Sequence, residues 1–454
     1  MTNTPVMQKN GGALAARMAD LALQLRDRSQ EPNVASLIGL TLLDAIAAAA
    51  AGFSTVAVRT ALDYARETYA PGAACLWFLD APGLQPSGAT FVNSTSMSAL
   101  DIDDGNRAAR GHVSAAVIPA VLAVGEVCDS GPADIAHAVL AGCEIGARLG
   151  VHEDPAFYAS GRWAGVGAAA AAGCLLGLDS EQLGNAISLA IHTSPILGPA
   201  GARREMTGHV KEGVAFGALV GVNAALLARS GYRGDPDAAE SVGIYDTASM
   251  NVSPEGELTF SRTYFKLYAC CRLAHSPIDA ILELLQRHRI EVQDIESIRV
   301  DTFTAAIELP NESKPSSLES AQYSLPFCIA TALRYGADAL LPLNPERLND
   351  PAIAELAERV QLTLDHEFDA KYPASTPSRI TIRTTSGVFT EARETADGDP
   401  SRPFSSAQIH AKLRRLANLS PSSRGIDSTL SRANELSARA WNALLSGTTR
   451  EDRN

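Results

Sequence analysis

The sequence lacks the short motifs that mark common hydrolases. It contains no H-E-x-x-H, no spaced pair of C-x-x-C motifs and no G-x-S-x-G, so zinc-dependent hydrolysis and nucleophile-elbow chemistry have no support. Its seven cysteines are odd in number and lie mostly in apolar helical runs. They predict reduced, buried thiols in a cytoplasmic protein rather than a disulfide framework.

Positive charge and long apolar runs are also scarce. The chain has 38 lysines and arginines against 51 acidic residues, a formal net charge of −13, which argues against nucleic acid or an anionic membrane as a partner. The two most apolar runs, 37–53 and 163–178, are alanine-rich and shorter than the roughly 18 residues of a membrane helix. The N-terminus lacks a signal-peptide pattern. We therefore expect a soluble protein with neither kind of partner.

Helical periodicity dominates the chain up to about residue 250. Apolar residues recur at helical spacing, with alanine and glycine between them, which predicts closely packed amphipathic helices. These segments are 12–25, 33–50, 114–128, 133–150, 181–193 and 213–231.

The pattern changes after about residue 260. Clusters of β-branched residues predict strands within 295–307, 360–368 and 377–387, between helical stretches at 277–290 and 320–336. Amphipathic helix returns at 405–418 and 429–445. Because a chain of 454 residues is too long to fold around one ordinary hydrophobic core, we expect a mainly α fold of two domains. An all-helical main domain comprises 1–262 and 400–454, and a smaller α+β lid comprises 263–399.

One glycine motif is misleading. The stretch GVGAAA, residues 165–170, fits the dinucleotide-binding pattern G-x-G-x-x-A. That site needs a preceding strand, which PAFYASGRW does not offer. Tight helix packing is the better interpretation.

The stretch ALDIDDGNRAARGHV, residues 99–113, raises a different question. It places Asp101, Asp103 and Asp104 at the end of a predicted helix, where the negative end of the helix dipole disfavours them. If the helix persists to residue 105, Asp101 and Asp104 share a face. The cluster either caps the next helix and pairs with nearby arginines, or it faces a buried cationic pocket.

Residues 99–126 resemble the MmgE/PrpD family pattern A-x-D-x-D-D-T, a spacer, H-P-[SG] and an apolar helix ending in A-E. Further matches are GAAAAAGCLLGL at 167–178, GVNAALLARSGYRG at 221–234, FKLYACCRLAHSPIDA at 265–280 and AQYSLPFCIATAL at 321–333. Their order along the chain makes the resemblance specific. It implies a homodimer and an interdomain active site without cofactor or metal. The implied chemistry lies beside a carboxylate of a small polycarboxylic acid, where cationic side chains stabilise the enediolate.

The resemblance also implies site residues. Lys266 matches the lysine of K-x-Y-P and would clamp a carboxylate or enediolate, and Lys211 lies where the family has a second lysine. Asp101 matches the functional aspartate, and His112 the histidine that acts as acid or base. His209 is a candidate helper.

The sequence departs from the family pattern at Val113, where the family has a proline, and at two polar positions. Gly105 replaces a threonine, which removes a hydroxyl, and Tyr158 replaces the second histidine. A tyrosine can donate a proton, but it is a reluctant base unless a cation such as Arg162 lowers its pKa. Arg162 could instead bind a carboxylate. Cys271 and His275 are as suited to structural roles as to catalysis. The substrate-binding candidates are Asp104, Arg162, His209, Cys271, Arg272, His275 and Tyr323.

The resulting prediction is a lyase acting on an aconitate-like or citrate-like acid, with decarboxylation favoured over dehydration. Loss of two polar groups weakens the case for expelling hydroxide, which needs a general acid at the leaving group. An epimerase or isomerase using the same site is the alternative, as in iminodisuccinate epimerases of the family. A catalytically inactive helical scaffold is a third hypothesis.

Overall fold

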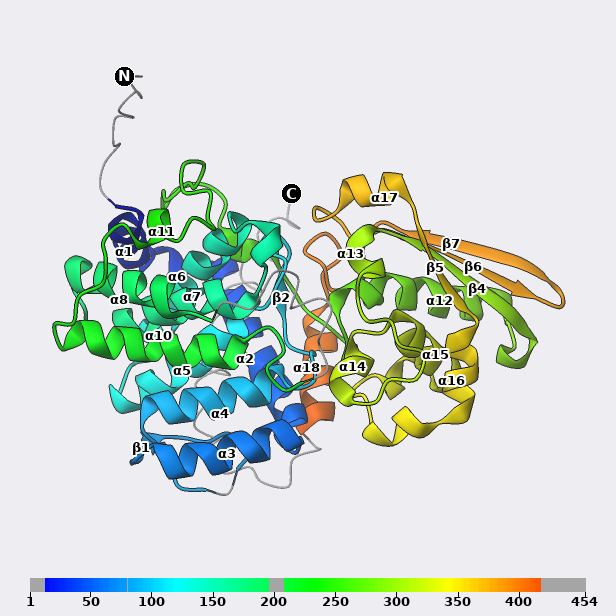
Figure 1. Ribbon diagram of the computed structural model, residues 1–454, viewed down its shortest axis with the longest axis horizontal. Helices are drawn as coiled ribbons and strands as arrows, with labels where there is room; N and C mark the ends of the chain where they lie inside the picture. The colour runs from blue at the N-terminus through cyan, green and yellow to red at the C-terminus, as the bar shows by residue number, and fades with distance from the viewer. Residues whose placement is uncertain (1–12, 80, 196–207, 418–454) are drawn as a thin grey trace, which may run out of the picture.

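The computed structural model describes residues 13–79, 81–195 and 208–417 and confirms a mainly α fold with a smaller sheet-containing part. Helices from the first 250 residues pack into what we call the helical body, drawn from blue to green in Figure 1. They are α1 (Leu14–Gln24), α2 (Pro32–Gly52), α3 (Val56–Thr68), α4 (Pro86–Ser98), α5 (Ser114–Val127), α6 (Pro132–Val151), α7 (Ser160–Leu175), α8 (Ser180–Thr193), α10 (Val214–Arg229) and α11 (Ala238–Ser241). A short strand, β1 (Pro71–Ala74), lies at the edge of this body.

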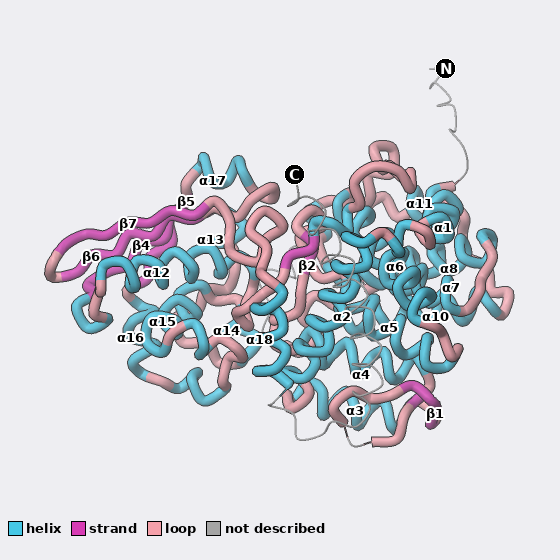
Figure 2. The backbone as a smooth tube through the Cα atoms, turned by 180° about the vertical axis from the view of Figure 1, so that it is seen from behind, coloured by secondary structure: helices cyan, strands magenta, loops and turns pink. Residues whose placement is uncertain are grey.

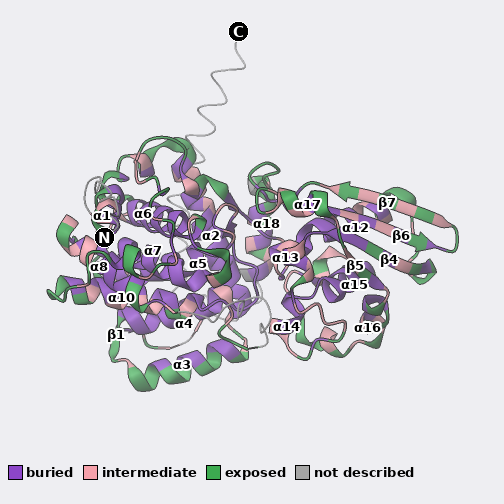
Figure 3. Ribbon diagram, turned by 45° about the horizontal axis from the view of Figure 1, so that its top comes forward, coloured by how far each residue is buried: buried purple, intermediate pink, exposed green. Residues whose placement is uncertain are grey.

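Small residues make the centre of the helical body dense. Nearly every residue of α5 and α7 is buried, and the same burial extends over most of α2 (Figure 3). Among the described residues, α2 alone is long and apolar enough to cross a membrane, and 78% of its apolar window is buried inside the protein. Such burial is typical of a core helix.

The stretch GVGAAA lies inside α7, as the packing interpretation predicted. A side chain at Gly167 would clash with the carbonyl oxygen of Gly142 in α6, and one at Gly165 would lie 2.7 Å from the carbonyl oxygen of Gly217 in α10. The two glycines therefore allow α7 to approach a helix on each side.

The sheet part contains one four-stranded sheet of order β5-β4-β6-β7, seen at one end of the molecule in Figure 2. β4 pairs in parallel with β5 and antiparallel with β6, so that Val300 faces Leu362 on one side and Ile380 on the other. The strands are β4 (Ile295–Thr302), β5 (Val360–Leu364), β6 (Ser378–Thr384) and β7 (Gly387–Arg393). The helices are α12 (His275–His288), α13 (Thr304–Ile307), α14 (Leu318–Gln322), α15 (Leu325–Tyr335), α16 (Pro351–Glu358) and α17 (His366–Lys371).

The strands end earlier than their composition predicted. β4 and β5 each give way to a short helix, α13 and α17, whose first backbone N–H groups bond Asp369 and Asp365 respectively. β7 was not anticipated, because its side chains alternate between half-buried and exposed without a buried residue. A two-residue turn joins it to β6.

Two connections tie the sheet part to the helical body. β2 (Gly105–Asn106) pairs antiparallel with β3 (Thr263–Tyr264), and α18 (Ser406–Ala417) packs against α2. Both β2 and α18 lie between the two parts in Figures 1 and 2. The helix expected at 429–445 lies outside the described residues, and the domain limits stay a prediction.

Candidate active site

A cavity of about 60 Å³ opens where the helical body meets the sheet part. Its wall combines basic, phenolic and acidic groups from distant segments of the chain. The helical body contributes Arg107, Arg110, His112, Tyr158 and Glu212, and later segments contribute Tyr264, Cys271, Arg272, Leu273, Ala305, Leu309, Tyr323, Tyr372 and Pro373.

The aspartate loop after α4 positions the acidic cluster, but it is not helical as one prediction assumed. α4 ends at Ser98, and Asp101 has a left-handed backbone with φ 51°. Asp101 and Asp104 therefore do not share a helix face. Asp104 accepts a hydrogen bond from the Ser114 hydroxyl at the start of α5, while Asp101 faces the basic residues.

Asp101 is the centre of a buried ion cluster. The Lys266 ammonium donates to its Oδ1 at 3.0 Å and to its carbonyl oxygen at 2.7 Å. The Lys211 Nζ lies 4.0 Å from the same Oδ1, so both lysines meet one carboxylate. Burial alone would raise the pKa of Asp101, but Lys266 and Lys211 overcome it and lower that pKa.

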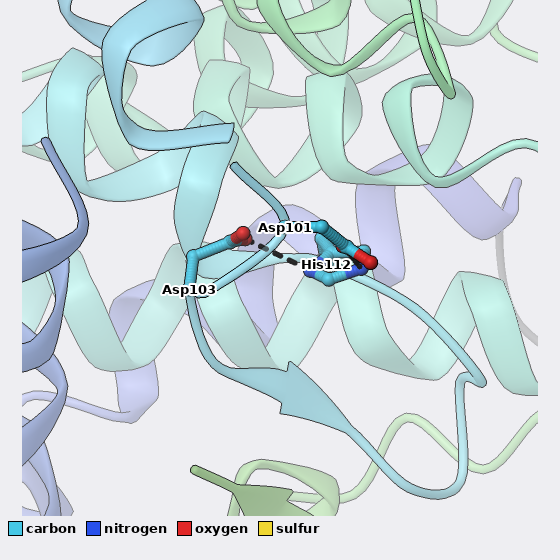
Figure 4. A group of neighbouring side chains, drawn as sticks. All are labelled: Asp101, Asp103 and His112. Atoms are coloured by element: carbon cyan, nitrogen blue, oxygen red, sulfur yellow. Dashed lines mark hydrogen bonds and ion pairs between the residues drawn. The ribbon is translucent and has the colours of Figure 1, made fainter. Parts of the chain in front are cut away.

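His112 bridges two carboxylates (Figure 4). Its Nδ1 lies 2.8 Å from Asp103 and its Nε2 lies 3.2 Å from Asp101. Although burial opposes the charge, Asp103 and Asp101 raise the pKa of His112 well above 6.5. The ring is therefore an imidazolium that donates from both nitrogens, and it is the member of the ion cluster that reaches the cavity wall.

The same three side chains have ligand atoms within 4.8 Å of one another, a spacing compatible with a metal ion. Their chemistry does not fit one well. An imidazolium has no free lone pair for a metal, and the Lys266 ammonium already lies against the Asp101 carboxylate. Ion pairs with Lys266 and His112 engage one oxygen of each carboxylate, while Asp101 Oδ2 and Asp103 Oδ1 have no hydrogen-bond partner among the described residues.

Lys211 and Tyr323 lie beside the cluster. The Lys211 ammonium donates to the carbonyl oxygen of Ser98 and to Gln322, each at 2.8 Å. It lies 5.6 Å from the centroid of the Tyr323 ring, which lines the cavity. Lys266 itself is completely buried, and the attraction of Asp101 raises its pKa despite that burial.

Tyr158 has a different partner from the one expected. Its hydroxyl lies 2.9 Å from Glu212 and 2.7 Å from the carbonyl oxygen of Arg110. Burial and the Glu212 carboxylate raise the pKa of Tyr158 well above 10. Arg162 does not lower that pKa, because its guanidinium lies 3.5 Å from Glu153 instead.

Glu212 is a cavity residue that sequence reasoning missed. It is buried, and it accepts hydrogen bonds from Tyr158 and Ser160. The only signal in the sequence was its position directly after Lys211. None of the family motifs places a carboxylate next to this lysine, so the sequence did not distinguish Glu212 from an acidic residue on the surface.

The remaining candidates divide between the cavity and its surroundings. Cys271 and Arg272 line the cavity. His209 is half-exposed and lies 3.8 Å from Glu319, away from the cavity wall.

His275 lies 3.2 Å from the carbonyl oxygen of Cys270, and burial and Arg272 lower its pKa well below 6.5, so it is neutral. Burial and Asp44 raise the pKa of Asp104 well above its usual value.

Comparisons with known proteins identify the family of the chain. The MmgE/PrpD N-terminal domain matches residues 16–255 and the MmgE/PrpD C-terminal domain matches 268–435. The chain is 29% identical to a cis-aconitate decarboxylase of Aspergillus terreus over 389 residues, 77% of this chain and 78% of the relative. It is 26% identical to the cis-aconitate decarboxylase-like protein oryM of Aspergillus oryzae, covering 90% and 91% of the two chains. The cis-aconitate decarboxylase of Mus musculus is 24% identical, covering 83% and 81%. The chain belongs to the MmgE/PrpD family.

Proposed function

We propose that this chain is a lyase that acts on a small di- or tricarboxylic acid resembling cis-aconitate, without a cofactor or a metal. The observation that carries the proposal is the convergence of Lys211 and Lys266 on Asp101, directly behind His112 on the cavity wall. The similarity to cis-aconitate decarboxylases supports the same substrate class.

Charge decides what such a cavity can bind. Lys211, Lys266 and the His112 imidazolium supply three cations, against the two carboxylates of Asp101 and Asp103. Arg107, Arg110 and Arg272 also line the wall, against one acidic lining residue, Glu212. A polyanionic acid is therefore attracted locally, although the protein as a whole carries a charge of −13.

Decarboxylation makes use of this excess charge. When the bond to the departing carboxylate breaks, carbon dioxide leaves and its electron pair stays on carbon. That pair delocalises onto a neighbouring carboxylate as an enediolate, which preorganised cations stabilise without reorganisation. The carbanion then needs one proton.

Tyr158 is the proposed proton donor. Its raised pKa keeps the phenol protonated at neutral pH, which suits an acid and not a base. Glu212 accepts a hydrogen bond from the Tyr158 hydroxyl at 2.9 Å and orients it, and a proton from water then restores the phenol. Expelling hydroxide from a citrate-like acid would need a stronger acid at the leaving group, so we favour decarboxylation over dehydration.

Epimerisation or isomerisation is the second candidate. It needs acid and base groups on two faces of one carbon. The cavity wall carries two separate titratable groups that fit this need, the His112 cluster and the Tyr158–Glu212 pair. Homodimeric assembly and a cytoplasmic location are further proposals, the first resting on family resemblance and the second on cysteine usage.

Incubation in deuterated buffer with cis-aconitate, trans-aconitate, 2-methylcitrate and a chiral aspartate-type diacid tests these alternatives. Release of carbon dioxide with one deuterium in the product supports decarboxylation. Loss of water identifies a dehydratase, and racemisation with deuterium uptake identifies an epimerase. Tyr158→Phe should slow the protonation step, whereas Tyr232→Phe, at an exposed position, should not. Absence of reaction with every acid would favour an inactive scaffold.

A further inference from the structure

Tyr264 occupies the space that a side chain at residue 105 would fill. The β2–β3 ladder pairs Gly105 directly with Tyr264. A Cβ atom at Gly105 would lie 2.5 Å from the Tyr264 Cζ and closer still to its hydroxyl oxygen. The phenol therefore lies over Gly105 in β2, directly after the aspartate loop.

Two arginines fix the orientation of this ring. The guanidinium carbons of Arg272 and Arg107 lie 4.7 Å and 5.2 Å from its centroid. Asp399 holds both arginines: the Arg107 Nε donates to its carboxylate at 2.9 Å, and the Arg272 Nη2 forms an ion pair with it at 3.8 Å. Because the ring is clamped, its hydroxyl has one position beside the cavity.

The Tyr264 hydroxyl has no hydrogen-bond partner among the residues that the structure describes. Tyr264 lines the cavity together with His112, Arg107 and Arg272. Burial raises the pKa of Tyr264 against the opposing effect of His112 and Lys266, so the phenol keeps its proton. A free donor among four cations is suited to an anionic oxygen.

We propose that Tyr264 is a substrate-binding residue, whose hydroxyl donates a hydrogen bond to a substrate carboxylate in the cavity beside Arg107 and Arg272. The inference rests on the proposed function for the class of ligand and adds to it a requirement for a second carboxylate. The acid would have one carboxylate near the His112 cluster and another at the Tyr264 corner. Gly105 enables this contact by leaving room for the ring.

The test separates the hydroxyl from the ring. Tyr264→Phe keeps the ring that fills the space over Gly105 and removes only the donor. Calorimetric titration with tricarballylate, a saturated tricarboxylate, should show binding weakened roughly 10- to 100-fold, the loss expected for one hydrogen bond to a charged group. In a turnover assay with the acid that proves active, KM should rise by a similar factor while kcat changes little. The thermal unfolding midpoint should stay unchanged, and Tyr232→Phe should match the wild type.

A second variant tests the role of Gly105. Gly105→Ala should displace the ring and weaken tricarballylate binding, but it should add little further loss in the Tyr264→Phe background, because the donor is already absent there. Equal binding by wild type and Tyr264→Phe would overturn this inference and leave the proposed function intact. Absence of tricarballylate binding to the wild type, together with absence of turnover, would overturn both.

Discussion

Asp101 keeps its charge inside the protein because cations surround it on several sides. Lys266 and His112 contact its carboxylate, and Lys211 lies 4.0 Å away. The desolvation of each ion is costly, and only the mutual attraction of the group offsets it. The cluster is therefore a set of interdependent residues, in which removal of one charge leaves its partner buried and uncompensated.

Lys266→Met removes one charge while keeping most of the side-chain length. We expect kcat to fall about 100- to 1000-fold, the usual loss on removing one preorganised stabilising group. We also expect the free energy of unfolding to fall by about 3–5 kcal/mol, because Asp101 stays buried with a cation missing. Urea unfolding and the turnover assay measure the two effects.

The double variant Lys266→Met, Asp101→Asn should recover much of that free energy of unfolding but none of the activity. Lys371→Met is the matched control, since this lysine pairs with Glu394 on the surface, and it should leave both quantities unchanged. Normal turnover by Lys266→Met would remove Lys266 from the catalytic group.

His112 should make stability depend on pH. Its pKa is raised in the folded protein, so its stabilising contribution is complete below the unfolded pKa of about 6.5 and is lost as pH rises through the folded pKa. The difference in free energy of unfolding between wild type and His112→Gln should therefore be larger at about pH 6 than at about pH 9. The exposed His366 supplies the control variant His366→Gln. A difference that grows with pH would contradict the imidazolium assignment.

Hydrophobic periodicity predicted which helices and strands exist better than it predicted where each one begins and ends. Each helical segment named for the first 250 residues lies on an observed helix, because a buried apolar face repeats with the helical period. Strand ends were less accurate, since β4 and β5 stop where short helices begin. β7 has no buried residue and thus no pattern to detect.

Gly167 offers a test of the close helix packing. Gly167→Ala should lower the free energy of unfolding by about 1–3 kcal/mol, because its Cβ would overlap the backbone of α6. Gly184 in α8 is the matched control, since a Cβ there would lie 3.5 Å from its nearest neighbour. Gly184→Ala should stabilise the protein by up to about 1 kcal/mol, through helix propensity. Equal effects of the two substitutions, measured by urea unfolding, would refute the packing explanation.

Across the whole chain, α18 joins the end of the described sequence to its beginning. The Lys412 ammonium donates to Asp44 in α2 at 2.6 Å and to the carbonyl oxygen of Ile102 at 2.7 Å. Both Lys412 and Asp44 are completely buried. Since Ile102 lies between Asp101 and Asp103, Lys412 holds the aspartate loop from behind and is a positioning residue.

Lys412→Met should therefore affect both stability and the site. We expect a loss of about 3–5 kcal/mol in the free energy of unfolding, because Asp44 would be buried without its partner. We expect kcat to fall as well, because the aspartate loop loses a fixed carbonyl. Arg414→Met, on the exposed face of the same helix, should change neither. If Lys412→Met, Asp44→Asn recovers stability but not kcat, the role in positioning the loop is supported. Unchanged kcat in Lys412→Met would exclude that role.

The sequence by itself determined the family and the mainly helical fold, and it named Asp101, His112, Lys211 and Lys266 as site candidates, because motifs and periodicity are local properties. Only the tertiary structure decided which of these residues meet. It placed Glu212 beside Tyr158, directed Arg162 toward Glu153, and paired Gly105 with Tyr264 across β2 and β3. The Tyr158–Glu212 and Gly105–Tyr264 contacts join residues more than 50 positions apart. Such contacts depend on how helices and strands pack, and no spacing within the chain encodes them.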